Sequence, residues 1–101
     1  MHELFDWDGA NRNHIAKHGI SPEEAEQVIF NEPFDLMLKQ QKGEERTVQV
    51  GETDTGRILV VVTTWRQDRI RVVTAFPAKK RIRKFYERQK AKGYGPESKD
   101  C

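Results

Sequence analysis

The first third of the chain shows two helical patterns of apolar and polar positions, preceded by a short alternating stretch. Residues 1–7 alternate loosely and predict a short edge strand. Asp8 suits the position before a helix, and Gly19 suits the left-handed position that often follows one. We therefore expect a first, short helix over residues 9–18.

A second helix begins at a strong N-terminal signal. Ser21 and Glu24 have the spacing of a capping box, and Pro22 stands at the first helical position, where its missing N–H costs nothing. The apolar residues that follow form one helical stripe, which consists of Ala25, Val28 and Ile29. Residues 31–33, with the sequence Asn-Glu-Pro, predict the end of this helix.

After residue 33 the apolar positions repeat every two residues, as they do in strands. The run 58–62 is apolar without a break, which predicts a central strand that is buried on both faces. Polar turns separate the alternating segments, so we expect the strands to form an antiparallel meander. The four predicted strands cover residues 34–39, 45–51, 57–65 and 69–76.

A basic helix is expected from Pro77 onward. Its apolar stripe consists of Ala78, Ile82, Phe85 and Tyr86, and its cations are Lys79, Lys80, Arg81, Arg83, Lys84, Arg88 and Lys90. Residues 93–101 mix Gly, Pro and Ser with charges and predict a disordered tail. The predicted fold class is α+β, with two N-terminal helices, an antiparallel sheet of four strands and a basic C-terminal helix in one domain over residues 1–92.

The size of the chain limits the kinds of protein it can be. With 101 residues, of which 36% are hydrophobic, it can form one modest core but not a two-domain enzyme with a cofactor cleft between the domains. Its apolar runs are far shorter than the ~20 residues of a membrane-spanning helix, so we expect a cytoplasmic protein without a membrane partner. The single cysteine, Cys101, excludes a disulfide framework and a Cys-x-x-Cys metal pair.

The charges are divided unevenly along the chain. Residues 1–65 carry 6 Lys and Arg against 12 Asp and Glu, whereas residues 66–101 carry 12 against 4. Such a basic C-terminal third favours a polyanionic partner, and nucleic acid fits better than a membrane because few apolar residues accompany the charges. The plain alternative is a solvated outer face of the last helix.

His14 and His18 lie one helical turn apart, which suits a metal pair if another element supplies a carboxylate. This spacing alone is weak evidence for a metal site, because helix capping or surface chemistry explains the two histidines equally well. His18 stands at the end of the first helix, where the helix dipole favours a cation, and an imidazole can both accept and donate a proton. We predict no metal site and treat His18 as a candidate for proton transfer.

Two arginines are predicted on sheet faces that are otherwise apolar. Arg46 alternates in phase with Val48 and Val50, and Arg71 with Val73 and Ala75. Salt bridges to nearby acids explain both arginines, and so does a cleft in which two guanidinium groups hold a phosphodiester. Glu45 points away from Arg46 in an ideal strand, so it can act as a base there only if a bulge or strand end turns it.

Several short motifs together resemble the BrnT family of type II toxins. The motifs are Phe5-Asp6-Trp7-Asp8, Asn11, Lys17-His18-Gly19-Ile20-Ser21, Glu24-Ala25, Gly43-Glu44-Glu45-Arg46, Gly51, Gly56-Arg57 with the run 58–62, Ile70 to Ala75, and Arg83 with Tyr86-Glu87. The resemblance covers residues 5–87. It implies a fold like that of the RelE-type ribonucleases and an antitoxin, BrnA, that neutralises the toxin and joins it in repressing their own promoter.

The resemblance also implies where the site residues lie. The basic and acidic positions of the family pattern fall on Lys17, Glu45, Arg46, Arg57 and Arg71. One departure concerns the last strand, which in the family ends Ser-Ala-Arg and here ends Thr74-Ala75-Phe76. Either Arg71, Lys79 or Lys80 replaces the missing arginine, or catalysis is weak or absent.

These observations predict a metal-independent endoribonuclease toxin that needs no cofactor. Arg46 and Arg71 would stabilise the phosphorane that forms when a 2′-hydroxyl attacks the adjacent phosphodiester, and Lys17, His18 or Glu45 would handle protons. Lys17 and Glu45 can equally form a salt bridge. RNA contacts are expected from Arg57, Lys79, Lys80, Arg83 and Lys84. The alternatives are a non-catalytic nucleic-acid binder or repressor component that reaches operator DNA with its antitoxin, and a pure interaction protein.

Overall fold

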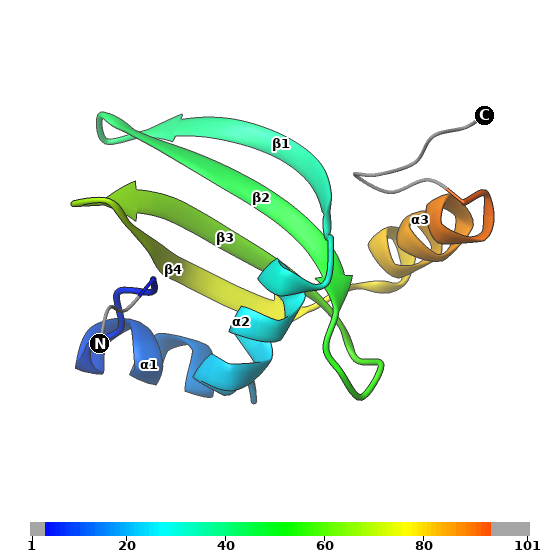
Figure 1. Cartoon of the computed structure of the whole chain (residues 1–101), viewed down its shortest axis with the longest axis horizontal. Helices are drawn as coiled ribbons and strands as arrows, with labels where there is room; N and C mark the ends of the chain where they lie inside the picture. Colours follow the sequence, from blue (N-terminus) through cyan, green and yellow to red (C-terminus); the bar gives the residue numbers. More distant parts are fainter. Residues whose placement is uncertain (1–3, 94–101) are drawn as a thin grey trace.

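A computed structural model describes residues 4–93 (Figure 1). The tail expected to be disordered therefore lies, apart from Gly93, outside the described residues, as do the first three residues of the expected N-terminal strand. The elements are α1 (Gly9–Ala16), α2 (Pro22–Phe30), β1 (Phe34–Gln41), β2 (Glu44–Glu52), β3 (Ile58–Arg66), β4 (Arg69–Pro77) and α3 (Lys80–Ala91). The sheet is antiparallel with the order β1-β2-β3-β4, so the α+β class and the meander are confirmed.

Both N-terminal helices begin at capping boxes. In α2 the Ser21 hydroxyl accepts the Glu24 N–H at 3.1 Å, and the Glu24 carboxylate accepts the Ser21 N–H at 3.1 Å. In α1 Asp8 is the N-cap, as expected, and Asn11 completes the box. This helix ends at Ala16, two residues earlier than expected, because the chain turns through Lys17 to reach Gly19 with a φ of +75°.

The expected N-terminal strand is not formed among the residues described. Phe5 makes only an isolated parallel bridge with Ile70 of β4. Two backbone hydrogen bonds hold it, from the Asp6 N–H to the Ile70 carbonyl at 2.8 Å and from the Ile70 N–H to the Leu4 carbonyl at 2.9 Å. The chain then leaves the sheet at Asp8 to start α1.

The last helix begins three residues later than expected. Pro77 is still part of the sheet, opposite Leu59, and the Ala78 N–H donates to the Ile58 carbonyl at 3.0 Å. Pairing with β3 therefore delays the start of the helix, and Lys79 is its N-cap. Between residues 4 and 93, no helix is long and apolar enough to cross a membrane.

The two faces of the sheet carry different partners (Figure 1). On one side, which we call the α1/α2 face, Leu59, Val61 and Val72 pack against both N-terminal helices. On the other side, the α3 face, Val50 and Val60 pack against Ala78 and Tyr86. Because α3 lies beside one end of the sheet, it leaves the far end of the α3 face uncovered, where the two hairpin turns are.

Bulges in the two outer strands, β1 and β4, place some side chains on the face opposite to the predicted one. Val62 pairs with Thr74, whereas Thr63 pairs with Val72, so Val73 is an extra residue in β4. As a result Val72 and Ala75 share the α1/α2 face, whereas the sequence placed Ala75 with Arg71 and placed Val72 with Phe76. Phe76 packs on the α3 face instead.

The bulge in β1 has the same effect. It lies between Asp35 and Met37, so Met37 pairs with Val48 and Leu38 pairs with Thr47. Leu38 therefore lies on the α1/α2 face, whereas Phe34, opposite Val50, lies on the α3 face. The two-residue repeat after residue 33 predicts that Phe34 and Leu38 share a face. This prediction was wrong, because strict alternation assumes strand pairing without a bulge.

Candidate functional site

A cavity of about 500 Å³ lies on the α3 face of the sheet, at the end away from α3. It is bounded by α1 on one side and by β2, β3 and β4 below. Its lining residues are Ala10, Asn11, His14, Glu44, Arg46, Thr64, Arg66, Arg71, Val73 and Thr74. Three of these side chains are arginines, which makes this cavity the strongest candidate for an anion site.

The strand register brings two of the arginines together. Thr64 of β3 is paired directly with Arg71 of β4. Val48 is paired with Val62 on the α3 face, so Arg46, two residues before Val48, and Thr64, two residues after Val62, also point to this face. The two arginines thus flank Thr64, whose hydroxyl donates to the Glu45 carbonyl at 2.9 Å. The sequence left two explanations open for these arginines, salt bridges to nearby acids or a shared cleft. Both side chains line this one cavity, and both are also paired with acids.

Arg71 is held by two acids from the N-terminal segment. Its Nη1 lies 3.1 Å from Asp8 Oδ2 and 3.4 Å from Asp6 Oδ2, and only 14% of its side chain is exposed. The hydrogen bond from Arg71 lowers the pKa of Asp8, and the Asn11 N–H adds to this. The same bond raises the pKa of Arg71 despite partial burial. The guanidinium is therefore permanently charged and fixed in orientation.

Arg46 is paired with Glu44, which the sequence did not single out. Its Nη2 lies 3.1 Å from Glu44 Oε1, and its Nη1 also reaches Gln41 Oε1 at 3.4 Å. Because β2 pairs with β3 without a bulge, Glu45 faces the α1/α2 side, and the carboxylate beside Arg46 is that of Glu44. The two-residue alternation of strands was the signal that could have indicated Glu44.

Arg66 supplies the third guanidinium and was also missed as a site residue. It lines the cavity from the end of β3, and about half of its side chain is exposed. Its Nη1 lies 3.9 Å from Asp6 Oδ2, so Asp6 contacts both Arg66 and Arg71. Of the three arginines, this one is the most accessible to a bound anion.

The histidine that reaches the cavity is His14, not His18. His14 lines the wall formed by α1. His18 does not line the cavity. Its ring packs edge-on against the His14 ring, with the centroids 6.0 Å apart, and against the Phe76 ring, with the centroids 6.1 Å apart. Lys17 is the exposed C-cap of α1 and does not line the cavity. In the described part of the chain, no group of three or more His, Cys, Asp or Glu side chains is placed to hold a metal ion.

The other basic residues proposed for RNA binding lie elsewhere. Arg57 donates to Glu24 Oε2 at 2.8 Å and to the Gly19 carbonyl at 3.2 Å, which fastens the start of α2. Lys79 is the N-cap of α3. Lys80, Arg83 and Lys84 are exposed on α3, which lies at the opposite end of the sheet from the arginine cavity (Figure 1).

Asn11 is the buried residue that joins the cavity wall to the sheet. Its Nδ2 donates to the Val72 carbonyl at 3.1 Å and to the Asp6 carbonyl at 3.0 Å, and its Oδ1 accepts the Asp8 N–H at 2.8 Å. Both acids that hold Arg71 are therefore positioned through one amide side chain. The motif Asp8-x-x-Asn11 was visible in the sequence, but its contact with β4 is not local.

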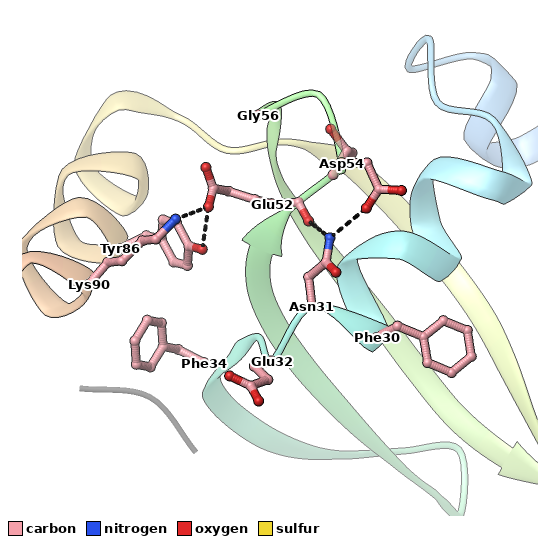
Figure 2. A pocket seen from close by; sticks show the side chains of 10 residues that line it. Phe30, Asn31, Glu32, Phe34, Glu52, Asp54, Gly56, Tyr86 and Lys90 are labelled. Atoms are coloured by element: carbon pink, nitrogen blue, oxygen red, sulfur yellow. Dashed lines mark hydrogen bonds and ion pairs between the residues drawn. The ribbon is translucent and has the colours of Figure 1, made fainter. Parts of the chain in front are cut away.

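A larger cavity, of about 790 Å³, lies between α2 and α3 (Figure 2). Glu32, Glu52 and Asp54 line it, and the cation there, Lys90, is paired with Glu52. Tyr86 also donates to Glu52 at 3.1 Å, and burial together with this bond raises the pKa of Tyr86 to about 12. A cavity wall so rich in carboxylates repels phosphate. The smaller cavity is therefore the better candidate for a phosphate site because of its charge, although it has the smaller volume.

A family model describes the ribonuclease toxin BrnT of type II toxin–antitoxin systems, and it matches residues 7–81. The chain belongs to the BrnT family. No curated protein matches it. The BrnT match includes every residue that lines the arginine cavity and ends near the start of α3, so Arg83 and Lys84 lie outside it. The resemblance seen in the sequence is thus confirmed.

Acid is expected to destabilise this BrnT protein. The hydrogen bond from Lys90 lowers the pKa of Glu52 against the effect of burial, and Arg71 lowers the pKa of Asp8. Burial pushes the pKa of Glu24 upward, but the Ser21 N–H and Arg57 outweigh it and leave this pKa lowered too. Carboxylates with a lowered folded pKa stabilise the fold above their ordinary values of 3.8 to 4.5, and this contribution is lost as pH falls further.

Urea unfolding at pH 7, 5, 4 and 3 measures this effect. We expect the free energy of unfolding to fall steadily below about pH 5. In Glu52→Gln one of the three carboxylates no longer titrates, so the fall should be shallower. Equal stability at pH 7 and pH 3 would contradict the assignment of these ion pairs.

Proposed function

We propose that this BrnT protein is an endoribonuclease that cuts RNA without a metal ion, and that a BrnA-like antitoxin neutralises it. The observation that supports this most is the arrangement of Arg46, Arg66 and Arg71 around one cavity on the uncovered end of the α3 face. Planar guanidinium groups bind phosphate oxygens through paired hydrogen bonds. Their positive charge suits a reaction in which negative charge increases on a phosphate.

The reaction proposed needs no external nucleophile. The 2′-oxygen of a ribonucleotide attacks the adjacent phosphorus, the bond to the 5′-oxygen of the next nucleotide breaks, and a 2′,3′-cyclic phosphate and a 5′-hydroxyl result. Arg46 and Arg71 stabilise the extra charge of the phosphorane. DNA lacks the 2′-hydroxyl and is not cut in this way.

Two protons have to move in this reaction, one from the 2′-hydroxyl and one to the 5′-oxygen. Lys17, His18 and Glu45 are our sequence-based candidates, and none of the three lines the cavity. His14 and Glu44 do line it, and they have the same chemical groups. We therefore add His14 and Glu44 as candidates for the acid and the base.

Incubation of the purified protein with total RNA tests the proposal. In excess EDTA we expect fragments with 2′,3′-cyclic phosphate and 5′-hydroxyl ends, in the same amount as with added magnesium. Mapping of the fragment ends distinguishes this chemistry from that of a metal-dependent nuclease, which leaves different termini. Intact RNA from a folded protein, or cleavage with magnesium alone, would contradict metal-independent cleavage.

The exposed cations of α3 favour a second role, in binding nucleic acid without cutting it. Lys79, Lys80, Arg83 and Lys84 lie away from the arginine cavity and can contact phosphates of RNA or, with the antitoxin, of operator DNA. Binding of this kind weakens steeply with salt because counterions are released. A protein that binds in this way and leaves RNA intact would be a repressor component and not a nuclease. In both roles we propose a cytoplasmic location.

A further inference from the structure

A groove on the α1/α2 face lies on the opposite side of the sheet from the arginine cavity. It has a volume of about 190 Å³ and is bounded by α2 and by three strands. Its lining residues are Ile29, Thr47, Gln49, Thr63, Thr64, Trp65 and Ile70. In Figure 1 both hairpin turns lie on the left, and α2 crosses the sheet toward its other end, so this part of the face is left uncovered.

Three large apolar side chains are exposed around this groove. Phe30 is 63% exposed, Leu38 66% and Trp65 67%. Trp65 lines the groove and pairs with Ile70, and Leu38 pairs with Thr47, which is another lining residue. The Phe30 ring packs edge-on against Phe5 at 5.7 Å, and Phe5 bridges to Ile70. These contacts place the three exposed side chains around one groove, which Ile29 and Ile70 line together with threonine and glutamine side chains.

Three large, exposed apolar side chains around one groove are unusual in a monomeric protein. Single exposed apolar residues are normal, but several of them around one groove indicate a binding surface. Aromatic residues such as Phe30 and Trp65 contribute strongly when a partner covers them. β1 is also the edge strand of the sheet at Leu38, with its outer backbone groups not paired by another strand.

The charges around the groove indicate the chemistry of the partner. The strand residues that share the α1/α2 face include the acids Asp35 and Glu45 and include no lysine or arginine. The cations of the strands lie on the other face, at Lys39, Arg46, Arg66, Arg69 and Arg71. A nucleic acid would be repelled on the α1/α2 side, whereas a peptide with apolar and basic side chains would be attracted.

We propose that this groove anchors the antitoxin, through an amphipathic segment that inserts apolar side chains between Leu38, Trp65 and Phe30 and places basic side chains beside Asp35 and Glu45. This inference rests on the proposed function, because it takes the occupant to be the antitoxin of a type II pair. In this proposal the two faces of the sheet have different functions. RNA binds at the α3 face, and the antitoxin binds at the α1/α2 face.

Neighbouring residues of β1 provide a matched test. Leu38 and Met37 are both exposed, at 66% and 54%, but they point to opposite faces. The probe is the antitoxin encoded beside the gene for this chain, titrated by calorimetry against wild type, Leu38→Asp, Trp65→Asp and Met37→Asp. We expect both groove variants to bind at least about 10-fold more weakly, and Met37→Asp to bind like wild type. RNA cleavage should be unchanged in all three variants, which also shows that they fold.

The outcomes separate this inference from the proposed function. If wild type cuts RNA and binds the antitoxin, but the groove variants bind it equally well, the groove is not the anchor. Loss of binding in Met37→Asp alone would move the partner to the α3 face. A concentration-dependent dimer that Trp65→Asp dissociates, with antitoxin binding unchanged, would make the occupant a second copy of this chain. If wild type neither cuts RNA nor binds the antitoxin, the proposed function fails and this inference fails with it.

Discussion

Replacing Arg46 by alanine is expected to slow RNA cleavage by about 100- to 1,000-fold, which is the usual effect of removing one donor to a transition-state anion. The loss should appear mainly in kcat, because the guanidinium opposes charge that develops as the phosphorane forms. The fold should survive, because Arg46 is a partly exposed residue near a hairpin turn and its partners are Glu44 and Gln41. Single-turnover cleavage and a melting curve measure the two effects.

Two further variants make this result specific. Arg12→Ala removes an exposed arginine of α1 that lies over the Trp7 ring and does not line the cavity, so cleavage should be unchanged. Arg46→Lys keeps the charge but loses the planar, paired hydrogen bonds, so it should restore only part of the rate. A folded Arg46→Ala protein with the wild-type rate would remove this residue from the mechanism.

Replacing Asn11 by alanine is expected to lower the free energy of unfolding by about 3 kcal/mol, because it leaves several buried polar groups without a partner. The carbonyls of Asp6 and Val72 would lose their donor, and the Asp8 N–H would lose its acceptor. Loss of these contacts should also loosen the two acids that hold Arg71. Cleavage is therefore expected to fall even under conditions in which the variant is folded.

Asn13→Ala is the matched control, since Asn13 is an exposed residue of the same helix. Its unfolding free energy should change by less than about 0.5 kcal/mol, as is usual for a surface substitution. Urea unfolding of both variants gives the comparison directly. Equal stability of the two would mean that the buried amide network does not hold α1 to β4.

The sequence predicted those parts of the fold that depend on neighbours along the chain. The start of α2 follows from Ser21, Pro22 and Glu24, which satisfy the backbone of one helical turn by themselves. The side of β2 on which Arg46 lies also follows from simple alternation, because no bulge interrupts the pairing of β2 with β3. In both places the local pattern and the tertiary structure agree.

The parts that the sequence did not predict depend on contacts between distant segments. The extra residue Val73 places Ala75 and Phe76 on faces opposite to those expected, and only the register against β3 determines it. The contact of Asn11 with Val72 joins residues 61 positions apart. Arg71 was expected to meet an acid or a phosphate, and the fold supplies Asp6 and Asp8.

The contrast between bulged outer strands and regular inner strands limits how the gene for this protein can change. β1 and β4 already contain one extra residue each, so the loss or gain of a single codon there changes the size of a bulge. The pairing of β2 with β3 contains none. If the codon for Thr47 were lost, Arg46 and Glu44 would turn toward the α1/α2 face and Glu45 toward the cavity. An in-frame deletion of three nucleotides would therefore put a carboxylate in the place of the Arg46 guanidinium. Single-codon length changes are therefore compatible with this site in the outer strands and incompatible with it in the inner ones.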